Sequence, residues 1–461
     1  MQKAIAKYGL AAHLAILAVA PLFLFPFFAD CTVAVVLLWL SLPAAAWTFM
    51  QPSVRRGEML HDARARVSRS VFCDPLFWVL LVAVFFSGIR ALNTGVAMVY
   101  DAEKFSWVVA PPALSLMPAS SGDAGFLPFA ASLACMVLVV ACRHALGRSA
   151  RQAYFLVSST LAGVAATLAL FMASMGNAVA SEMLSCPHKD LSFVGIAFAV
   201  HFVCGLVAAV SALESKWNRA IPVLVVSVGG TAAGAFAFCP AYASGIFLAA
   251  WLAVFAYSFF YALCVIRRAA EFKLLLVLGV SLASAWVLLS ITAAGTPVTD
   301  RVAAFTDRVF LPEWYDAARN AVSALALKAW MASPWSGTGV GSFAIDIRFN
   351  ATPEDWAAIP RGLVAPPFGW LKLLTERGIA GVAMLALPLL IMLGTYFVRL
   401  YRWALTRTAP QPGCWAGLAV VGAVVATGFF DCSYLRADVL IAVSAVLALS
   451  ASTFPKAGRG S

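Results

Sequence analysis

Long apolar stretches alternate with short polar ones along almost the whole chain. Each is close to the roughly 20 residues that a helix needs to cross a bilayer. The predicted spans are 9–28, 31–50, 75–92, 126–142, 153–173, 191–212, 221–239, 243–265, 274–293, 378–398, 414–430 and 437–452. This pattern of about twelve spans predicts an all-α polytopic membrane protein.

Basic residues gather in alternate connections between these spans. The segments that hold most of the 32 Lys and Arg residues are the N-terminus, 51–74, 143–152, 213–220, 266–273, 399–413 and the C-terminal tail. Short loops rich in Lys and Arg remain on the cytoplasmic side of a membrane. We therefore expect both termini in the cytoplasm and the intervening loops outside.

Composition agrees with a membrane location. Hydrophobic residues make up 62% of the chain and charged residues only 11%. Ordinary globular chains contain about 25% charged residues, so a soluble globular protein is excluded. The net charge of +11 is explained by cytoplasmic loops that meet anionic membrane lipids, and it does not indicate nucleic-acid binding.

One connection, 294–377, is too long to be a simple linker, because structureless loops of this length are uncommon unless they are functional. It lies between the ninth and tenth spans, on the predicted outer side. The predicted divisions of the chain are spans 1–9 (1–293), a large helical periplasmic loop (294–377), and spans 10–12 with a cytoplasmic tail (378–461).

The loop has recognisable parts of its own. Its pattern predicts a helix around 315–332, a glycine-rich turn at 334–343, and a short helix that is opened by Pro366-Pro367 and runs to about Glu376. In this short helix Phe368, Leu371 and Leu374 form an apolar face. The polar face contains Lys372, Thr375 and Glu376.

Within this loop Arg319 precedes the run PWSGTGVGSF, which begins at Pro334 and is followed by FGWLKLLTERGIAG, which ends at Gly381. This order resembles the large periplasmic loop of the O-antigen ligase and O-antigen polymerase superfamily. There an Arg-led helix, a P-x-x-G-x-G-x-G-x-F turn and an L-x-L-L-x-E-x-G-x-x-G helix follow one another. The resemblance is specific over about 319–381 and architectural elsewhere.

The resemblance implies an enzyme of envelope polysaccharide or lipopolysaccharide assembly in the bacterial inner (cytoplasmic) membrane. It would transfer a glycan from a polyprenyl-pyrophosphate donor to a hydroxyl of lipid A core, another glycan or a protein. Positioned arginines can offset the charge of the leaving pyrophosphate, so neither a metal ion nor another cofactor is expected.

The sequence also departs from the family pattern. The family His, nine residues before the Glu, is replaced by Pro367, and Ser244 stands at the position of a family Arg in the segment Ala243-Ser244-Gly245. Arg319 alone of the three family catalytic positions is retained. Either the role of the base has moved to a carboxylate, or the activity has changed or been lost.

These comparisons give the candidate site residues. Arg319 is the candidate catalytic arginine, and Asp346 is the candidate replacement base because an extended strand would aim it in the same direction as Arg348. The candidate pyrophosphate contacts, each of which could instead be solvated or salt-bridged, are Arg301, Arg308, Arg348 and Arg361. Gly337, Gly339 and Gly341 could cradle phosphate, but backbone freedom for a tight turn against the membrane helices is the favoured interpretation.

Several alternatives stay open. Asp101 and Glu103 in the outer loop 93–125 could bind a divalent metal, and His188 could supply a base from another outer loop. His201, within a span, is interpreted as a satisfied polar helix contact, although an ionisable residue there merits a test. The alternative functions are a catalytically inactive relative that binds or escorts lipid-linked glycan, and a lipid or glycan transporter.

Overall fold

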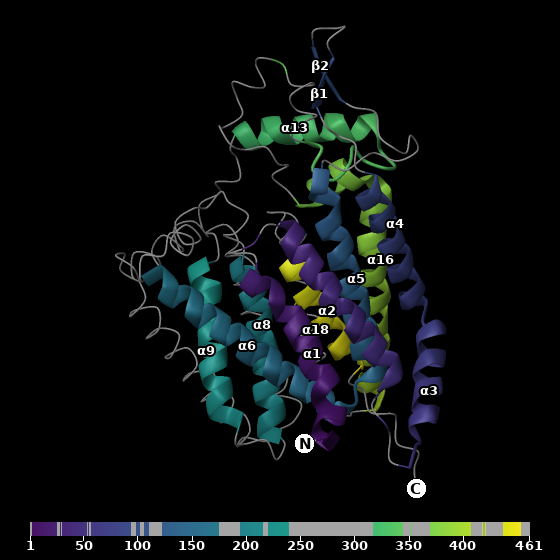
Figure 1. Cartoon of the computed structure of the whole chain (residues 1–461), viewed down its shortest axis with the longest axis vertical. Helices are drawn as coiled ribbons and strands as arrows, with labels where there is room; N and C mark the ends of the chain where they lie inside the picture. Colours follow the sequence, from purple (N-terminus) through teal and green to yellow (C-terminus); the bar gives the residue numbers. More distant parts are fainter. Residues whose placement is uncertain are drawn as a thin grey trace.

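The computed structural model describes a helical bundle with a crosswise helix at one end (Figure 1). The described residues are 2–24, 28, 30–52, 54, 57–93, 98–101, 106–109, 122–174, 194–214, 220–238, 317–343, 352, 369–406, 417, 420 and 437–452.

Each long helix of the bundle lies on one of the predicted spans. The bundle helices are α1 (Gln2–Leu24), α2 (Asp30–Met50), α4 (Pro75–Leu92), α5 (Phe126–Val140), α6 (Arg148–Ser174), α8 (Val194–Glu214), α9 (Ile221–Phe238), α16 (Gly369–Thr406) and α18 (Ala437–Ser452). The predicted spans 243–265 and 274–293, and almost all of 414–430, lie outside the described residues.

Among the described residues, five helices are long and apolar enough to cross a membrane. They are Asp30–Met50, Pro75–Leu92, Phe126–Ala145, Ser149–Met172 and Gly369–Met392. The chain is therefore a helical membrane protein. The total of about twelve spans and the outer position of 294–377 stay predictions.

Large apolar side chains point out from the bundle, as expected where lipid is the solvent. Trp39 is 73% exposed, and Phe85 and Val226 are also exposed. The interior contains many small residues instead, among them Ala34, Ala134 and Ala166, which are fully buried. Small residues at helix contacts allow backbones to approach closely, which is how helices associate in a membrane.

The contact between α6 and α9 depends on such residues. A Cβ atom on Gly163 of α6 would lie 2.7 Å from the Cα atom of Ser227 on α9, so a side chain at this position would force the helices apart. Gly230 of α9 packs directly on the backbone of Gly163, and Gly234 packs against Ala166. Together these contacts hold α6 and α9 at close range.

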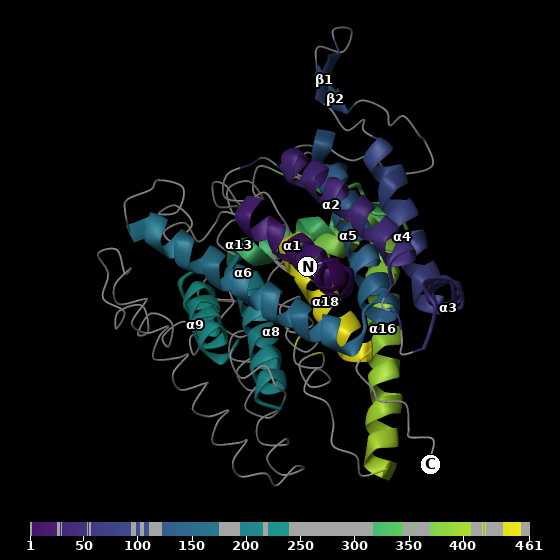
Figure 2. The ribbon, with the colours of Figure 1, turned by 60° about the horizontal axis from the view of Figure 1, so that its bottom comes forward.

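Two strands, one amphipathic helix and a π-helical turn were not predicted from the apolar pattern. Strands β1 (Met98–Asp101) and β2 (Ser106–Val109) form an antiparallel hairpin with Met98 opposite Val109, which projects from the molecule in both views (Figures 1 and 2). The all-α prediction is therefore correct for the bundle but not for this hairpin. An amphipathic helix, α3 (Leu60–Phe72), precedes α4, and a π-helical turn, η2 (Ala141–Ala145), extends α5.

Helix α13 (Ala317–Ala332) lies across one end of the bundle and corresponds to the helix predicted around 315–332. It packs on the beginning of α16. The predicted short helix that runs to about Glu376 and the predicted span that begins at 378 both lie within α16, and they meet at a kink at Gly378, where φ is 65° and ψ is −169°. A short 3₁₀ helix, η1 (Gly122–Gly125), precedes α5.

Candidate functional site

The glycine turn, residues 333–343, is bound directly to the kink of α16. The amide of Thr338 donates to the carbonyl of Thr375 at 2.8 Å, and the amide of Gly339 donates to the carbonyl of Glu376 at 3.0 Å. On the other side of the kink, the amide of Ile379 donates to Pro334 O at 2.9 Å. Backbone groups released by the kink are thus satisfied by the turn.

The glycines of this turn are required by its geometry. Gly337, Gly339 and Gly341 have φ angles of 71°, 115° and 73°, a region that favours glycine. A Cβ atom on Gly337 would lie 2.5 Å from backbone atoms of Glu376 and Arg377. This geometry supports the interpretation as a tight turn against a membrane helix. The Gly337 and Gly339 amides of the alternative phosphate cradle already have carbonyl partners.

A buried hydroxyl group joins the helix before the kink to α13. Thr375 is fully buried, and its Oγ1 donates to the carbonyl of Leu371 at 2.8 Å and lies 3.2 Å from the carbonyl of Ala326 on α13. Glu376 is only 7% exposed. Thr375 and Glu376 of the predicted polar face are therefore both buried, at the place where the glycine turn and α13 meet this helix.

Arg90 of α4 contacts both the glycine turn and α16 just before its kink. Its side chain is buried, with 2% exposure, and its guanidinium donates to Glu376 O at 3.1 Å and to Ser336 O. The guanidinium carbon lies 4.6 Å from the ring centroid of Phe86, which is a cation–π contact. Sequence reasoning missed Arg90, although an arginine inside an apolar span is itself a signal of function.

A groove begins next to this assembly and extends between α4, α5, α16 and α18. Arg377 lines one end of it. The positive charges of Arg377 and Arg90 are close enough to interact. The remaining lining residues are Leu76, Leu80, Ala83, Phe86, Ser87, Ser132, Cys135, Val139, Leu373, Gly381, Met384, Leu385, Pro388, Leu389, Met392, Leu440, Val443, Ser444 and Leu447.

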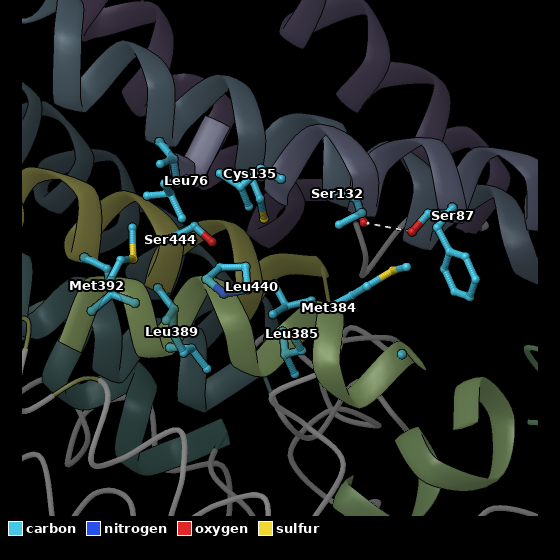
Figure 3. A pocket seen from close by; sticks show the side chains of 18 of the residues that line it. Leu76, Ser87, Ser132, Cys135, Met384, Leu385, Leu389, Met392, Leu440 and Ser444 are labelled. Atoms are coloured by element: carbon cyan, nitrogen blue, oxygen red, sulfur yellow. Dashed lines mark hydrogen bonds between the residues drawn. The ribbon is translucent and has the colours of Figure 1, made fainter. Parts of the chain in front are cut away.

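The groove is apolar along its length and has a charged end. Figure 3 shows Met384, Leu385 and Leu389 of α16 facing side chains of α4, α5 and α18 across it. Its cavity volume is about 140 Å³. On α4 the lining extends from Leu76 to Ser87, which corresponds to roughly 17 Å of helix.

Glycine also makes room for the charged end of the groove. A Cβ atom on Gly381 would collide with the Cβ atom of Arg377, one turn earlier on the kinked helix. The glycine therefore lets the base of the Arg377 side chain pack against the helix. The groove can hold a chain-like apolar group, with a guanidinium beside the position of an anionic head.

A second polar cluster lies at the opposite end of α4. The Asp74 carboxylate accepts from Arg143 Nε at 2.8 Å and contacts His144 Nε2 at 2.9 Å, and its other oxygen caps α4 by accepting from the amide of Leu76 at 3.1 Å. Burial raises the pKa of the Asp74 carboxyl. The hydrogen bond with His144 and the charge of Arg143 outweigh burial, so the pKa lies below its ordinary value.

The structure places only part of the predicted site. Arg319 belongs to α13, but its side chain is outside the description. The predicted site residues that lie wholly outside the described residues are Arg301, Arg308, Asp346, Arg348 and Arg361. The alternative candidates Glu103 and His188 also lie outside them. Asp101 ends strand β1. The glycines are thus the predicted residues that the structure connects to Arg90 and Arg377.

Within the described part of the chain, no three His, Cys, Asp or Glu side chains lie close enough together to hold a metal ion. Comparison with known protein families and with curated proteins found no match for this chain. The function must therefore be argued from the groove and the residues around it.

Proposed function

We propose that the chain is a membrane glycosyltransferase of ligase or polymerase type. In this proposal it transfers a glycan from a polyprenyl-pyrophosphate donor to a hydroxyl acceptor during assembly of an envelope polysaccharide. The acceptor oxygen bonds to the sugar carbon that releases the pyrophosphate, and the acceptor proton passes to a base. The observation that carries the proposal is the apolar groove that ends at Arg377 beside the glycine turn.

The shape and chemistry of the groove support a lipid-linked substrate. A bilayer has a hydrocarbon core about 30 Å thick, so a groove of roughly 17 Å along α4 could hold several isoprene units within the membrane. Its lining is mostly apolar, so it would surround those units with apolar side chains. A soluble sugar nucleotide has no apolar chain that would use such a surface.

Positive charge near the end of the groove supports a pyrophosphate head. Arg377 lines the groove, and Arg90 lies close enough to interact with it electrostatically. Arginine suits this role because its planar guanidinium can contact two phosphate oxygens at once. The Arg90 guanidinium holds backbone carbonyls, so we assign it to positioning and assign Arg377 to the substrate.

The family resemblance adds Arg319 as a second substrate arginine. Arg319 lies on α13. This helix packs on α16, the helix that contains Arg377. Asp346 stays the proposed base, since Pro367 stands where the family has its His. The other loop arginines Arg301, Arg308, Arg348 and Arg361 stay proposed contacts of the donor.

The test is transfer by the full-length protein in lipid nanodiscs, with a polyprenyl-pyrophosphate glycan and candidate acceptors. Release of polyprenyl pyrophosphate is measured with and without a chelator. Replacing Arg377 by Ala is expected to slow release by about 10²–10³-fold, the loss seen when one preorganised donor is removed. Arg377→Lys should restore only part of the rate, because a point charge cannot make a bidentate contact.

Arg64→Ala is the matched control, since Arg64 is exposed on α3 and donates to the carbonyl of Met50. It should leave the rate unchanged. Loss of transfer on chelation, with Arg377→Ala still active, would contradict the proposal and favour the metal alternative at Asp101 and Glu103.

A second candidate function is a binding protein for lipid-linked glycan that has no transferase activity. Pro367 and Ser244 favour it, because they replace the family His and one family Arg. The same samples distinguish the two functions. Binding of the donor without release of polyprenyl pyrophosphate, with every acceptor tested, would support the second candidate.

A further inference from the structure

A chain of buried polar side chains runs between α6 and α8, away from the groove. Ser158 of α6 and His201 of α8 are both buried, and the Ser158 Oγ atom lies 2.9 Å from His201 Nδ1. Tyr154 is one turn earlier on the same face of α6 and is fully buried. These three side chains form a polar path within the interior of the bundle.

Both ends of this path are unsatisfied. Among the described residues, neither Tyr154 Oη nor His201 Nε2 has a hydrogen-bond partner, although both atoms are buried. The backbone of Ala18 on α1 is a polar neighbour of the imidazole. The sequence-based interpretation of His201 as a satisfied helix contact is therefore correct for only one of its two ring nitrogens.

A buried polar atom without a partner costs roughly 1–3 kcal/mol. Such atoms in folded proteins are commonly satisfied by internal water, which forms about three hydrogen bonds. A metal ion is a poor occupant, because no group of three His, Cys, Asp or Glu ligands occurs in the described part of the chain. Water can accept a hydrogen bond from Tyr154 Oη. It can also donate to His201 Nε2 when this nitrogen is unprotonated and accept from it when it is protonated.

The surroundings contain few groups that compete for a proton. The titratable groups that face Tyr154 are the thiols of Cys142 on η2 and Cys204 on α8, and Arg151 lies beyond Cys142. From α1 the neighbour of His201 is the Ala18 backbone. The path thus extends from His201 toward the end of α6 at which Arg148 begins the helix.

We infer that α1, α6 and α8 enclose an internal water site, and that water completes a proton path through Tyr154, Ser158 and His201. Hydronium beside His201 gives a proton to Nε2 and is left as water, while Nδ1 releases its proton to Ser158 Oγ. Ser158 passes its own hydroxyl proton to water beside Tyr154, which becomes hydronium, and the neutral ring is left in its other tautomer. This inference does not depend on the proposed glycosyl transfer.

Water-edited solid-state NMR of the uniformly ¹⁵N-labelled full chain in lipid bilayers tests the inference. The experiment measures transfer of magnetisation from water to each nitrogen. The chain has five histidines, and the ring of His201 is identified by the signals that His201→Gln removes. The backbone amide of Ala197, fully buried on the same helix, gives the reference for a dry position.

We expect a cross peak between water and the His201 ring that builds up much faster than that of the Ala197 amide. Tyr154→Phe removes only the hydroxyl and should abolish or strongly slow this transfer, whereas Tyr8→Phe should leave it unchanged. Buildup at the His201 ring equal to that of Ala197 would show a dry site and overturn the inference. Fast buildup that Tyr154→Phe does not affect would overturn the continuous path.

Discussion

At the kink of α16, the glycine turn provides the hydrogen bonds that a straight helix would make within itself. The amides of Ile379 and Ala380 donate to carbonyls of Pro334 and Trp335. The turn can approach this closely only because Gly337 and Gly378 face each other without side chains. A Cβ atom on Gly378 would lie 2.5 Å from the amide nitrogen of Gly337.

Alanine at Gly337 or Gly378 is therefore expected to destabilise the protein by two separate effects. Left-handed backbone angles cost a non-glycine residue roughly 1–2 kcal/mol, and the collision with the opposite backbone adds to this cost. Thermal unfolding in detergent or nanodiscs should show a clearly lower melting temperature for both variants.

Two other glycines separate these effects. Gly57 also has a positive φ, of 79°, but open space surrounds it, so Gly57→Ala should show only the smaller conformational cost. Gly394 lies in α16 with open space around it, and Gly394→Ala should be neutral or slightly stabilising. Equal melting temperatures for Gly57→Ala and Gly337→Ala would contradict the proposed close contact.

At the residue scale, local patterns predicted the turn but not its partners. The spacing of Gly337, Gly339 and Gly341 is a local property of the chain and was interpreted correctly as a tight turn. The contact of Arg90 with Glu376 joins residues 286 positions apart, so no periodicity in either segment could reveal it. Glu376 was placed on the polar face of its helix, but periodicity within this helix could not show that the glycine turn packs on it.

The helices at the other end of the bundle are joined by charge. Asp74 caps α4 and also pairs with Arg143 and His144 of η2, so one carboxylate fixes the start of one helix against the end of another. The side chain of Asp74 is 6% exposed and that of Arg143 is 19% exposed, so water screens this pair little. Protonation of Asp74 should weaken both connections.

The sign of the pH dependence follows from the lowered pKa of Asp74. The pKa in the folded state lies below the ordinary value of 3.8, so the unfolded state binds a proton first as the pH falls. The stabilisation by Asp74 is complete above that value and is lost as the pH falls through the folded-state pKa. The melting temperature should therefore decline below about pH 4.

Asp74→Asn should remove this acid-dependent component and lower stability at pH 7 by on the order of 3 kcal/mol, because Arg143 loses its buried partner. Asp62→Asn is the control, since Asp62 is exposed on α3 and should have little effect. Melting temperatures measured from pH 3 to pH 7 test both statements. An Asp74→Asn variant as stable as wild type at pH 7 would contradict the assigned role.

At the element scale, the predicted helices follow directly from apolar length, because the bilayer sets a minimum span. The π-helical turn Ala141–Ala145 and the hairpin Met98–Val109 could not be predicted in this way. The first depends on a local change in hydrogen bonding, and the second lies in a short segment between spans that has no apolar periodicity. The break before the tenth span was predicted, because the short helix was expected to end at about Glu376 and the span to begin at 378, and the kink lies at Gly378.

At the scale of the whole molecule, one bundle presents apolar side chains to lipid, and α13 lies across its end (Figure 1). The groove opens within the same bundle, so a lipid-linked substrate could enter it without leaving the membrane. The length of the apolar stretches and the low content of charged residues predicted the membrane location. The groove, however, is formed by four helices that are far apart in the chain. Composition alone therefore could not locate it.

The central claim is that this groove holds the apolar chain of a polyprenyl-pyrophosphate donor. Native mass spectrometry of the full-length protein with polyprenyl pyrophosphate measures this binding directly. Leu385 lines the groove, whereas Leu387 on the same helix is exposed outside it. We predict that Leu385→Trp fills the groove and abolishes the bound lipid peak, while Leu387→Trp binds as wild type. Equal binding by both variants would contradict the claim.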